Sequence, residues 1–311
     1  MKLLLQFCCL ASLVYLTGCS GSGKNKTSEN ANAASAGNVK IPVPVATTNK
    51  IIKDEKDLPG YWVGAFRTDS VPDSSDYEDA SVWDNATKIN ISIDAINGSQ
   101  VSGHSIDAGT FTPFTGTVDH TGNIYRFLVK EPGHGKYDGA FTFSIRTGDS
   151  VLSGTWKADH EISTPMRYYD LTKKFFKYDP DLNLDLATYV NTNKKKNVKI
   201  KIDDTSEYNT TKYSMATGDY AKLNASAKLL TTAQVANLKA ADLLLLRNYI
   251  FARHGYAFKK PAIQAFFDQQ DWYIPVSTNV MDELTPVEKQ NIALIKRYEK
   301  NAKEHYDSFG R

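Results

Sequence analysis

Residues 88–106 read KINISIDAINGSQVSGHSI, and this stretch decides the fold of the first half of the chain. Apolar and polar residues alternate from Lys88 to Asp94, which is the pattern of a β-strand with one buried face. The dipeptide Asn97-Gly98 favours a tight turn, and a second strand candidate runs from Val101 to Ile106. The stretch therefore predicts an antiparallel β-hairpin.

The same period of two continues on both sides of this hairpin. Six more strand candidates are Tyr61 to Phe66, Phe114 to Val118, Ile124 to Lys130, Gly139 to Arg146, Val151 to Lys157 and Met166 to Leu171. No segment with a helical period lies between them. About eight short strands joined by tight turns predict an all-β antiparallel domain at residues 58–171. We expect it to close into a barrel, because closure removes exposed strand edges.

A short unit recurs in these strands, in which apolar residues stand two positions before and two after a glycine. The central glycines are Gly64, Gly116, Gly139 and Gly154. A glycine at such a place permits a close approach of neighbouring backbone in a strongly bent strand. The Gly-x-Trp element at Gly154 loosely resembles lipocalin-like barrels. The interior is expected either to be filled by side chains or to hold a small apolar ligand.

The C-terminal part begins with residues 242–258, DLLLLRNYIFARHGYAF, which predict a helix and its end. Leu243, Leu246 and Ile250 fall on one apolar face. Gly255 lies where a left-handed C-cap is expected.

Two more helices are expected after this one. The second begins at Lys260-Pro261. The third begins at Thr285, where Thr-Pro-Val-Glu is a capping box with proline at the first helical position. Its apolar stripe is expected to run through Val287, Asn291 and Leu294. Three helices at residues 229–311 predict a small all-α bundle.

These C-terminal residues resemble the YARHG domain, a family of bacterial modules regarded as extracellular. The resemblance covers about Leu229 to Glu299. Its motif residues are Arg247-Asn248, Phe251 to Gly255, Phe258, Phe267, Trp272-Tyr273, Glu288 and Asn291 to Ile295. Phe251 replaces the tyrosine in the family's name, which puts any role of that hydroxyl in doubt. The family has no established molecular activity, so the resemblance implies a domain and not a reaction.

Two interpretations of the motif residues remain open. In the first, Arg253 and His254 lie in the last helical turn, where cations complement the helix dipole, and the residues are structural. In the second, six residues form a binding patch, with arginines that grip carboxylates of peptidoglycan stem peptides and aromatic faces that stack on sugars. The patch would comprise Arg247, Asn248, Arg253, His254, Trp272 and Tyr273.

The first nineteen residues read MKLLLQFCCLASLVYLTGC and have the layout of a signal peptide. Leu16-Thr17-Gly18-Cys19 resembles the lipobox of bacterial lipoproteins. The resemblance implies cleavage of residues 1–18, acyl chains such as palmitate on Cys19, and anchorage in the cell membrane or outer membrane with the domains outside the cytoplasm, periplasmic or surface-exposed. Residues 19–57, rich in Ser, Gly, Asn and Lys, are expected to be a flexible tether, and residues 172–228 a connector.

The net charge and the cysteine content argue against several classes of function. The net charge of +2 gives no large field toward nucleic acid. The three cysteines, Cys8, Cys9 and Cys19, leave the mature chain without a free thiol or a thiolate metal site. No catalytic motif, metal cluster or cofactor motif is present.

We therefore expect a non-catalytic envelope protein that binds or scaffolds, with peptidoglycan or an envelope protein as partner. A carrier or sensor of a small apolar ligand is the first alternative. A hydrolase that uses His254 with Asp268 or Asp271 is the second.

Overall fold

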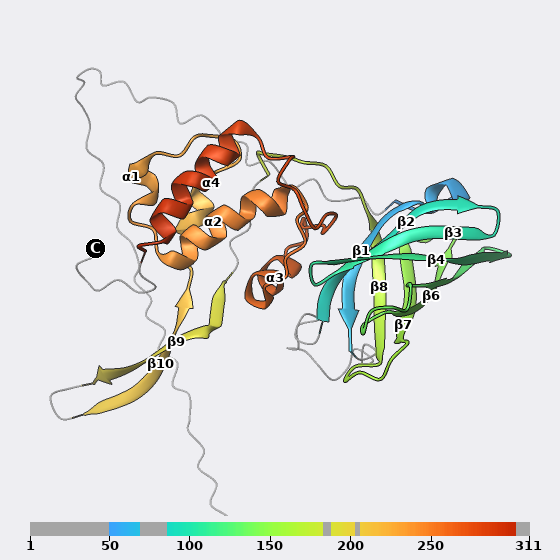
Figure 1. Cartoon of the computed structure of the whole chain (residues 1–311), viewed down its shortest axis with the longest axis horizontal. Helices are drawn as coiled ribbons and strands as arrows, with labels where there is room; N and C mark the ends of the chain where they lie inside the picture. Colours follow the sequence, from blue (N-terminus) through green and yellow to red (C-terminus); the bar gives the residue numbers. More distant parts are fainter. Residues whose placement is uncertain (1–49, 69–85, 183–187, 203–205, 303–311) are drawn as a thin grey trace, which may run out of the picture. The chain divides into compact units, whose positions relative to one another are not determined.

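The computed structural model describes residues 50–68, 86–182, 188–202 and 206–302. The expected signal peptide, Cys19 and the part of the expected tether up to residue 49 lie outside these ranges. Strands occupy the first half of the described chain, and helices follow in the second half (Figure 1). None of the helices within the described ranges has both the length and the apolar character needed to cross a membrane.

The first half is a closed antiparallel barrel of eight strands, as the sequence predicts. Each strand pairs with the next, and the last pairs with the first. The strands are β1 (Gly60–Arg67), β2 (Ala86–Asn97), β3 (Gln100–Asp107), β4 (Thr110–Thr121), β5 (Ile124–Lys130), β6 (Gly139–Arg146), β7 (Val151–Ala158) and β8 (Met166–Lys174). All eight strand candidates are confirmed.

The alternation of the sequence sets which side chains fill the barrel. Ile89, Ile91 and Ile93 of β2 belong to its core and are at most 1% exposed. On β5 the side chains of Tyr125, Phe127 and Val129 belong to this core. The alternation of inward and outward side chains continues in the other strands.

The glycines of the recurring unit bring neighbouring strands together. A Cβ added to Gly116 would lie 2.1 Å from the backbone oxygen of Leu128, and one added to Gly154 would lie 2.3 Å from that of Thr142. Gly64 and Gly139 face backbone oxygens in the same way, at 2.6 and 2.3 Å. This confirms the predicted close approach, because no larger residue fits there without moving backbone.

One end of the barrel is closed by the residues before β1. Ile52 and Leu58 are fully buried and belong to the barrel core, and a short 3-10 helix, η1 (Glu55–Asp57), lies between them. The indole nitrogen of Trp62 donates to the carbonyl oxygen of Leu58 at 3.0 Å. Because these residues fill the end where β1 starts, any opening to the interior lies at the opposite end.

A two-stranded ribbon follows the barrel, inside the segment expected to be a connector. Its strands are β9 (Val190–Lys201) and β10 (Glu207–Met215), which form a two-stranded antiparallel sheet. The lysine run of the sequence, Lys194 to Lys196, lies on β9.

The described part of the second half contains the three expected helices and two short additional turns. They are α2 (Ala240–Arg253), α3 (Pro261–Asp268) and α4 (Pro286–Glu299), preceded by η2 (Asp219–Lys222) and the single-turn α1 (Thr232–Val235). The predicted capping box is present at α4, since Thr285 and Glu288 satisfy each other's backbone N–H groups. Gly255 takes the predicted left-handed conformation, with φ of 71°.

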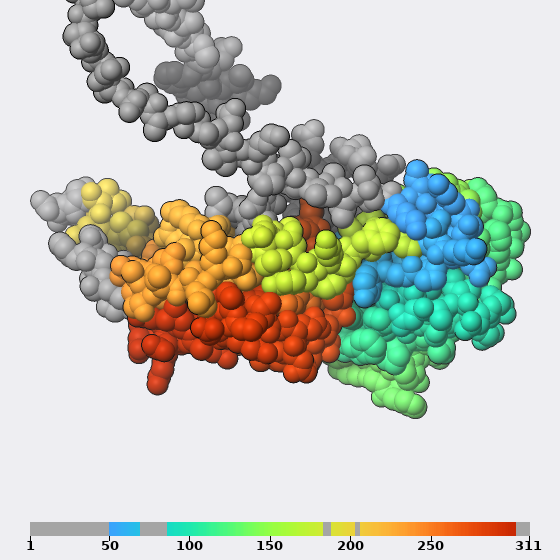
Figure 2. Space-filling view, turned by 90° about the horizontal axis from the view of Figure 1, so that it is seen from above, coloured from blue at the N-terminus to red at the C-terminus, as the bar shows by residue number. Residues whose placement is uncertain are grey.

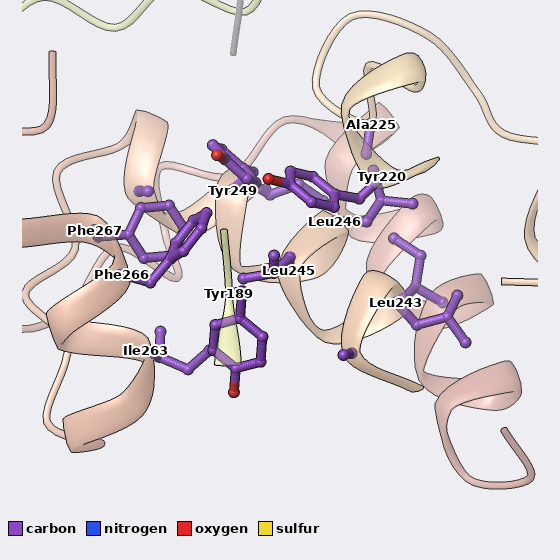
Figure 3. Close-up of a cluster of buried hydrophobic side chains, with 14 of the residues drawn as sticks. Tyr189, Tyr220, Ala225, Leu243, Leu245, Leu246, Tyr249, Ile263, Phe266 and Phe267 are labelled. Atoms are coloured by element: carbon purple, nitrogen blue, oxygen red, sulfur yellow. The ribbon is translucent and has the colours of Figure 1, made fainter. Parts of the chain in front are cut away.

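An aromatic and aliphatic core holds these helices together. Figure 3 shows Tyr249 of α2 close to Phe266 and Phe267 of α3, and Leu246 of α2 beside Tyr220 of η2. Tyr249 makes edge contacts with both phenylalanines, at centroid distances of 5.9 and 5.0 Å. In the space-filling view the C-terminal helices, orange to red, form one continuous block (Figure 2).

The apolar stripe of α4 differs in phase from the prediction. Asn291 is buried as expected, but Ile292 and Ile295 are buried where Val287 and Leu294 were expected, and the latter two are only partly covered. The helical spacing of the stripe agrees with the prediction. The tertiary contacts of Glu288 and Asn291 determine which face of α4 is buried. Asn291 donates to the carbonyl oxygens of Ala225 and Lys228 at 2.7 Å each.

The outer face of β2 also departs from a simple alternation. Lys88 and Asn90 point away from the barrel interior, yet they are 5% and 0% exposed. The Lys88 ammonium donates to the carbonyl oxygen of Gln270 at 2.7 Å, and the Asn90 amide donates to that of Pro275 at 2.8 Å. Backbone carbonyls after α3 therefore cover a strand face that the sequence leaves polar.

Candidate functional site

His254 lies at the end of α2, where its ring is enclosed and not presented to solvent. The residue is 3% exposed and forms the C-cap of the helix. Its Nε2 lies 2.8 Å from Oε2 of Glu288, and its ring stacks on Tyr178 at a centroid distance of 4.2 Å. Three segments of the chain therefore meet at this imidazole.

Glu288 is the acceptor at the centre of this cluster. Its carboxylate also accepts the Tyr178 hydroxyl at 3.2 Å and the backbone N–H of Thr285 at 2.9 Å. Burial would raise the pKa of Glu288, but the hydrogen bonds from His254 and Thr285 outweigh it and lower the pKa. Burial and the neighbouring Glu288 raise the pKa of Tyr178 to about 12, so its phenol stays a donor.

The two arginines of the predicted patch are engaged inside the domain. Arg253 is 4% exposed and donates to the carbonyl oxygen of Leu182 at 3.1 Å. Arg247 makes a two-point ion pair with Glu299, at 2.7 and 3.1 Å, which joins α2 to α4.

The remaining members of the patch are also held by internal contacts. Asn248 donates to the carbonyl oxygen of Leu244 within α2, at 2.7 Å. Tyr273 is 2% exposed, and its hydroxyl donates to the carbonyl oxygen of Tyr256 at 2.7 Å. Trp272 packs on Tyr249 at a centroid distance of 6.0 Å. The structure brings these residues together in one domain, but it does not present Arg253, His254 or Tyr273 on its surface.

The two carboxylates expected to act with His254 in a hydrolase do not contact it. Asp268 accepts the backbone N–H of Lys88 at 3.0 Å, and Asp271 is exposed. Burial raises the pKa of Asp268 and lowers that of Lys88, while the attraction between the two charges opposes both shifts. The carboxylate that His254 contacts is Glu288.

A cavity of about 490 Å³ lies at the end of the barrel opposite η1. Turns β3–β4, β5–β6 and β7–β8 contribute to its rim, and Phe66, Phe141 and Trp156 line it inside. Its volume falls within the range typical of small-molecule sites, about 300–1,000 Å³. The interior is thus filled by side chains along most of the barrel and hollow at one end.

The cavity contains a buried carboxylate, that of Glu131. The residue follows β5 directly and is 6% exposed. One oxygen accepts the hydroxyl of Ser105 at 3.0 Å, and the other accepts the N–H groups of Gly139 and Trp156 at 2.8 and 3.2 Å. Burial raises the pKa of Glu131, although these hydrogen bonds oppose the shift.

Asp107 and Arg167 complete the charged lining inside the barrel. Asp107 accepts the Thr87 hydroxyl at 2.6 Å, and burial raises its pKa against the pull of Arg167. The Arg167 guanidinium donates to the carbonyl oxygen of Phe66 at 3.2 Å and lies over the Phe66 ring at 5.0 Å. These residues were not singled out from the sequence, although the inward register of β3 and β5 leads to Asp107 and Glu131.

A second cavity, of about 240 Å³, lies beside α2 and the base of the ribbon. Tyr189, Lys194 and Glu299 line it together with small residues of α2. It is half the size of the barrel cavity, and Glu299 is already paired with Arg247. Across the part of the chain that the structure describes, no group of three or more His, Cys, Asp or Glu side chains could hold a metal ion.

Comparison with known proteins identifies one of the two domains. Residues 219–300 match the YARHG domain family, and the match begins at η2, ahead of the expected Leu229. No curated protein and no solved structure matches the chain. The motif residues quoted above lie inside the matched range, and most form the core and the His254 cluster. The chain thus carries a C-terminal YARHG domain at residues 219–300, which follows an eight-stranded β-barrel.

Proposed function

We propose that this chain is a non-catalytic lipoprotein of the bacterial envelope and that its barrel binds a small ligand. The cavity of about 490 Å³ at the end of the barrel opposite η1 carries the proposal. A barrel interior that served stability alone would be close-packed, with few voids larger than a water molecule. The cavity also combines aromatic walls with a few polar groups, as ligand sites do.

The motif residues of the YARHG domain support a different role. Arg253 and His254 are buried and hydrogen-bonded within the domain, so they favour a structural part over direct contact with peptidoglycan. We propose that the domain is a rigid module whose surface, and not its motif, meets any envelope partner.

A cavity-filling variant tests ligand binding. Thr112 of β4 lines the cavity, whereas Thr115 of the same strand is exposed on the outer face. We expect Thr112→Trp to remove most of the small molecules that co-purify with the protein, and Thr115→Trp to leave them unchanged. Native mass spectrometry, followed by solvent extraction, measures both. Equal ligand content in the two variants, or none in the unaltered protein, would contradict the proposal.

The anchor is tested separately. The lipobox ending at Cys19 supports attachment through acyl chains, which hold a protein on a membrane when two or more are present. We expect Cys19→Ser to move the protein from the membrane fraction to the soluble fraction, and to abolish the mass increase from acylation. A variant that still partitions with membranes would show that another route holds it there.

A further inference from the structure

The charges inside the barrel cavity restrict the chemistry of its ligand. Glu131 has three hydrogen-bond donors but no cation, since none of the ion pairs among the described residues involves it. A buried carboxylate is stabilised when an opposite charge reaches it, because burial disfavours its charged form. The cavity therefore contains a buried negative group that would be stabilised by a positive charge on a ligand.

The other charges around the cavity favour a cation as well. Asp107 and Asp138 add two more carboxylates to the lining, against Lys136 and Arg167. Lys136 is exposed, with its ammonium 5.2 Å from the Tyr137 ring. Arg167 is already occupied by the Phe66 carbonyl and ring. An anionic ligand would meet three carboxylates, with the partly engaged Arg167 and the exposed Lys136 to offset them.

The aromatic walls point to the same class. Phe66 and Trp156 lie edge to face at a centroid distance of 5.9 Å, and Phe141 lies 6.4 Å from Phe66. Aromatic faces attract cations and also bury apolar ligand surface. A ligand with an apolar body and a positive end uses both the walls and the carboxylate.

We propose that the barrel cavity binds a small organic amine, whose ammonium group lies against Glu131 and whose apolar body lies against Phe66 and Trp156. This inference rests on the proposed ligand-binding function and narrows it to one chemical class. The sequence-based alternative of a purely apolar ligand would leave Glu131 without a counter-charge.

Three probes of similar shape test the charge preference. Tryptamine, tryptophol and indole-3-acetate share an indole and differ in a positive, neutral or negative end. We expect the full-length protein in phosphatidylcholine nanodiscs to bind tryptamine at least about 30-fold more tightly than the other two. Isothermal titration calorimetry, with empty nanodiscs subtracted, measures the affinities.

Two variants then assign the preference to Glu131. We expect Glu131→Gln to weaken tryptamine binding by about 30-fold and to leave tryptophol binding nearly unchanged. Asp119→Asn is the matched control, because Asp119 is an exposed carboxylate on β4 that does not line the cavity. If Glu131→Gln fails to fold, the probe series on the unaltered protein still decides the question.

The outcomes separate this inference from the function on which it rests. Equal or tighter binding of tryptophol or indole-3-acetate would overturn the amine and leave ligand binding in place. Failure of all three probes, while Thr112→Trp still removes a co-purified molecule, would also overturn the amine alone. If nothing binds and nothing co-purifies, both proposals fall.

Discussion

Replacing Glu288 with glutamine is expected to destabilise the YARHG domain by about 3 kcal/mol, a factor of more than about 100 in the folding equilibrium. The carboxylate accepts from three donors, those of His254, Tyr178 and Thr285. An amide has one acceptor oxygen, and its NH₂ group would face at least one of these donors. A buried donor left without a partner costs about 1–3 kcal/mol, and the buried Arg253 loses a neighbouring negative charge as well.

Glu283 provides the matched control for this variant. Its carboxylate lies 3.9 Å from Nδ1 of the same histidine, but its side chain is 54% exposed. We expect Glu283→Gln to change stability by less than about 0.5 kcal/mol. Urea unfolding followed by circular dichroism measures both variants. A similar effect of the two substitutions would mean that the His254 cluster is not held by Glu288.

The pH dependence of the difference gives an independent check. The pKa of Glu288 in the folded protein is below its ordinary value of 4.5. The stabilisation from its ionised form is therefore fully present above about pH 4.5, and it is lost as the pH falls through the lower folded-state pKa. We expect the stability gap between the unaltered protein and Glu288→Gln to be constant near neutrality and to narrow in acid. A gap that widens in acid would contradict the lowered pKa.

The barrel could be predicted from the sequence because its signals are local. Alternation at Ile89, Ile91 and Ile93 gives the inward face of β2, and the turn at Gly98 fixes its pairing with β3. The helix boundaries were predictable for the same reason, since Thr285 and Gly255 act through residues next to them.

The candidate sites depend on contacts between distant residues, which single-sequence patterns do not report. Glu288 was recognised as part of a capping box, but its second partner, His254, lies 34 residues away. Tyr178, from the segment expected to be a plain connector, completes that cluster. The motif therefore identified the right residues without revealing that they face one another in the interior.

The cavity was missed for another physical reason. Extension of the inward register of β5 by one step past Val129 leads to Glu131, a charged residue where an apolar one is expected. That break in the pattern is a usable signal, although alternation alone cannot tell a charged lining from the end of a strand. Lys88 shows the opposite case, because an outward lysine on β2 gives no sign in the sequence that backbone after α3 will cover it.

Replacing Gly116 with alanine is expected to destabilise the barrel by about 3 kcal/mol or more. The added Cβ would lie 2.1 Å from the backbone oxygen of Leu128 and 2.5 Å from the Cα atom of Val129. Gly116 pairs with Val129, one pair from the Thr115–Lys130 end of the β4–β5 ladder, and the atoms that the Cβ would meet are backbone atoms, not the end of a flexible side chain. The strands must separate, which weakens the hydrogen bonds on either side of the pair.

Gly98 separates this steric effect from the general loss of a glycine. It has a φ of 61° at a hairpin turn, and a Cβ there would meet nothing within 4 Å. Asparagine adopts the left-handed region readily, so we expect Gly98→Asn to change stability by less than about 0.5 kcal/mol. Trp62 and Trp156 in the barrel core report the unfolding of both variants by fluorescence. If Gly116→Ala proves as mild as Gly98→Asn, the recurring glycines are not the reason why the strands can approach so closely.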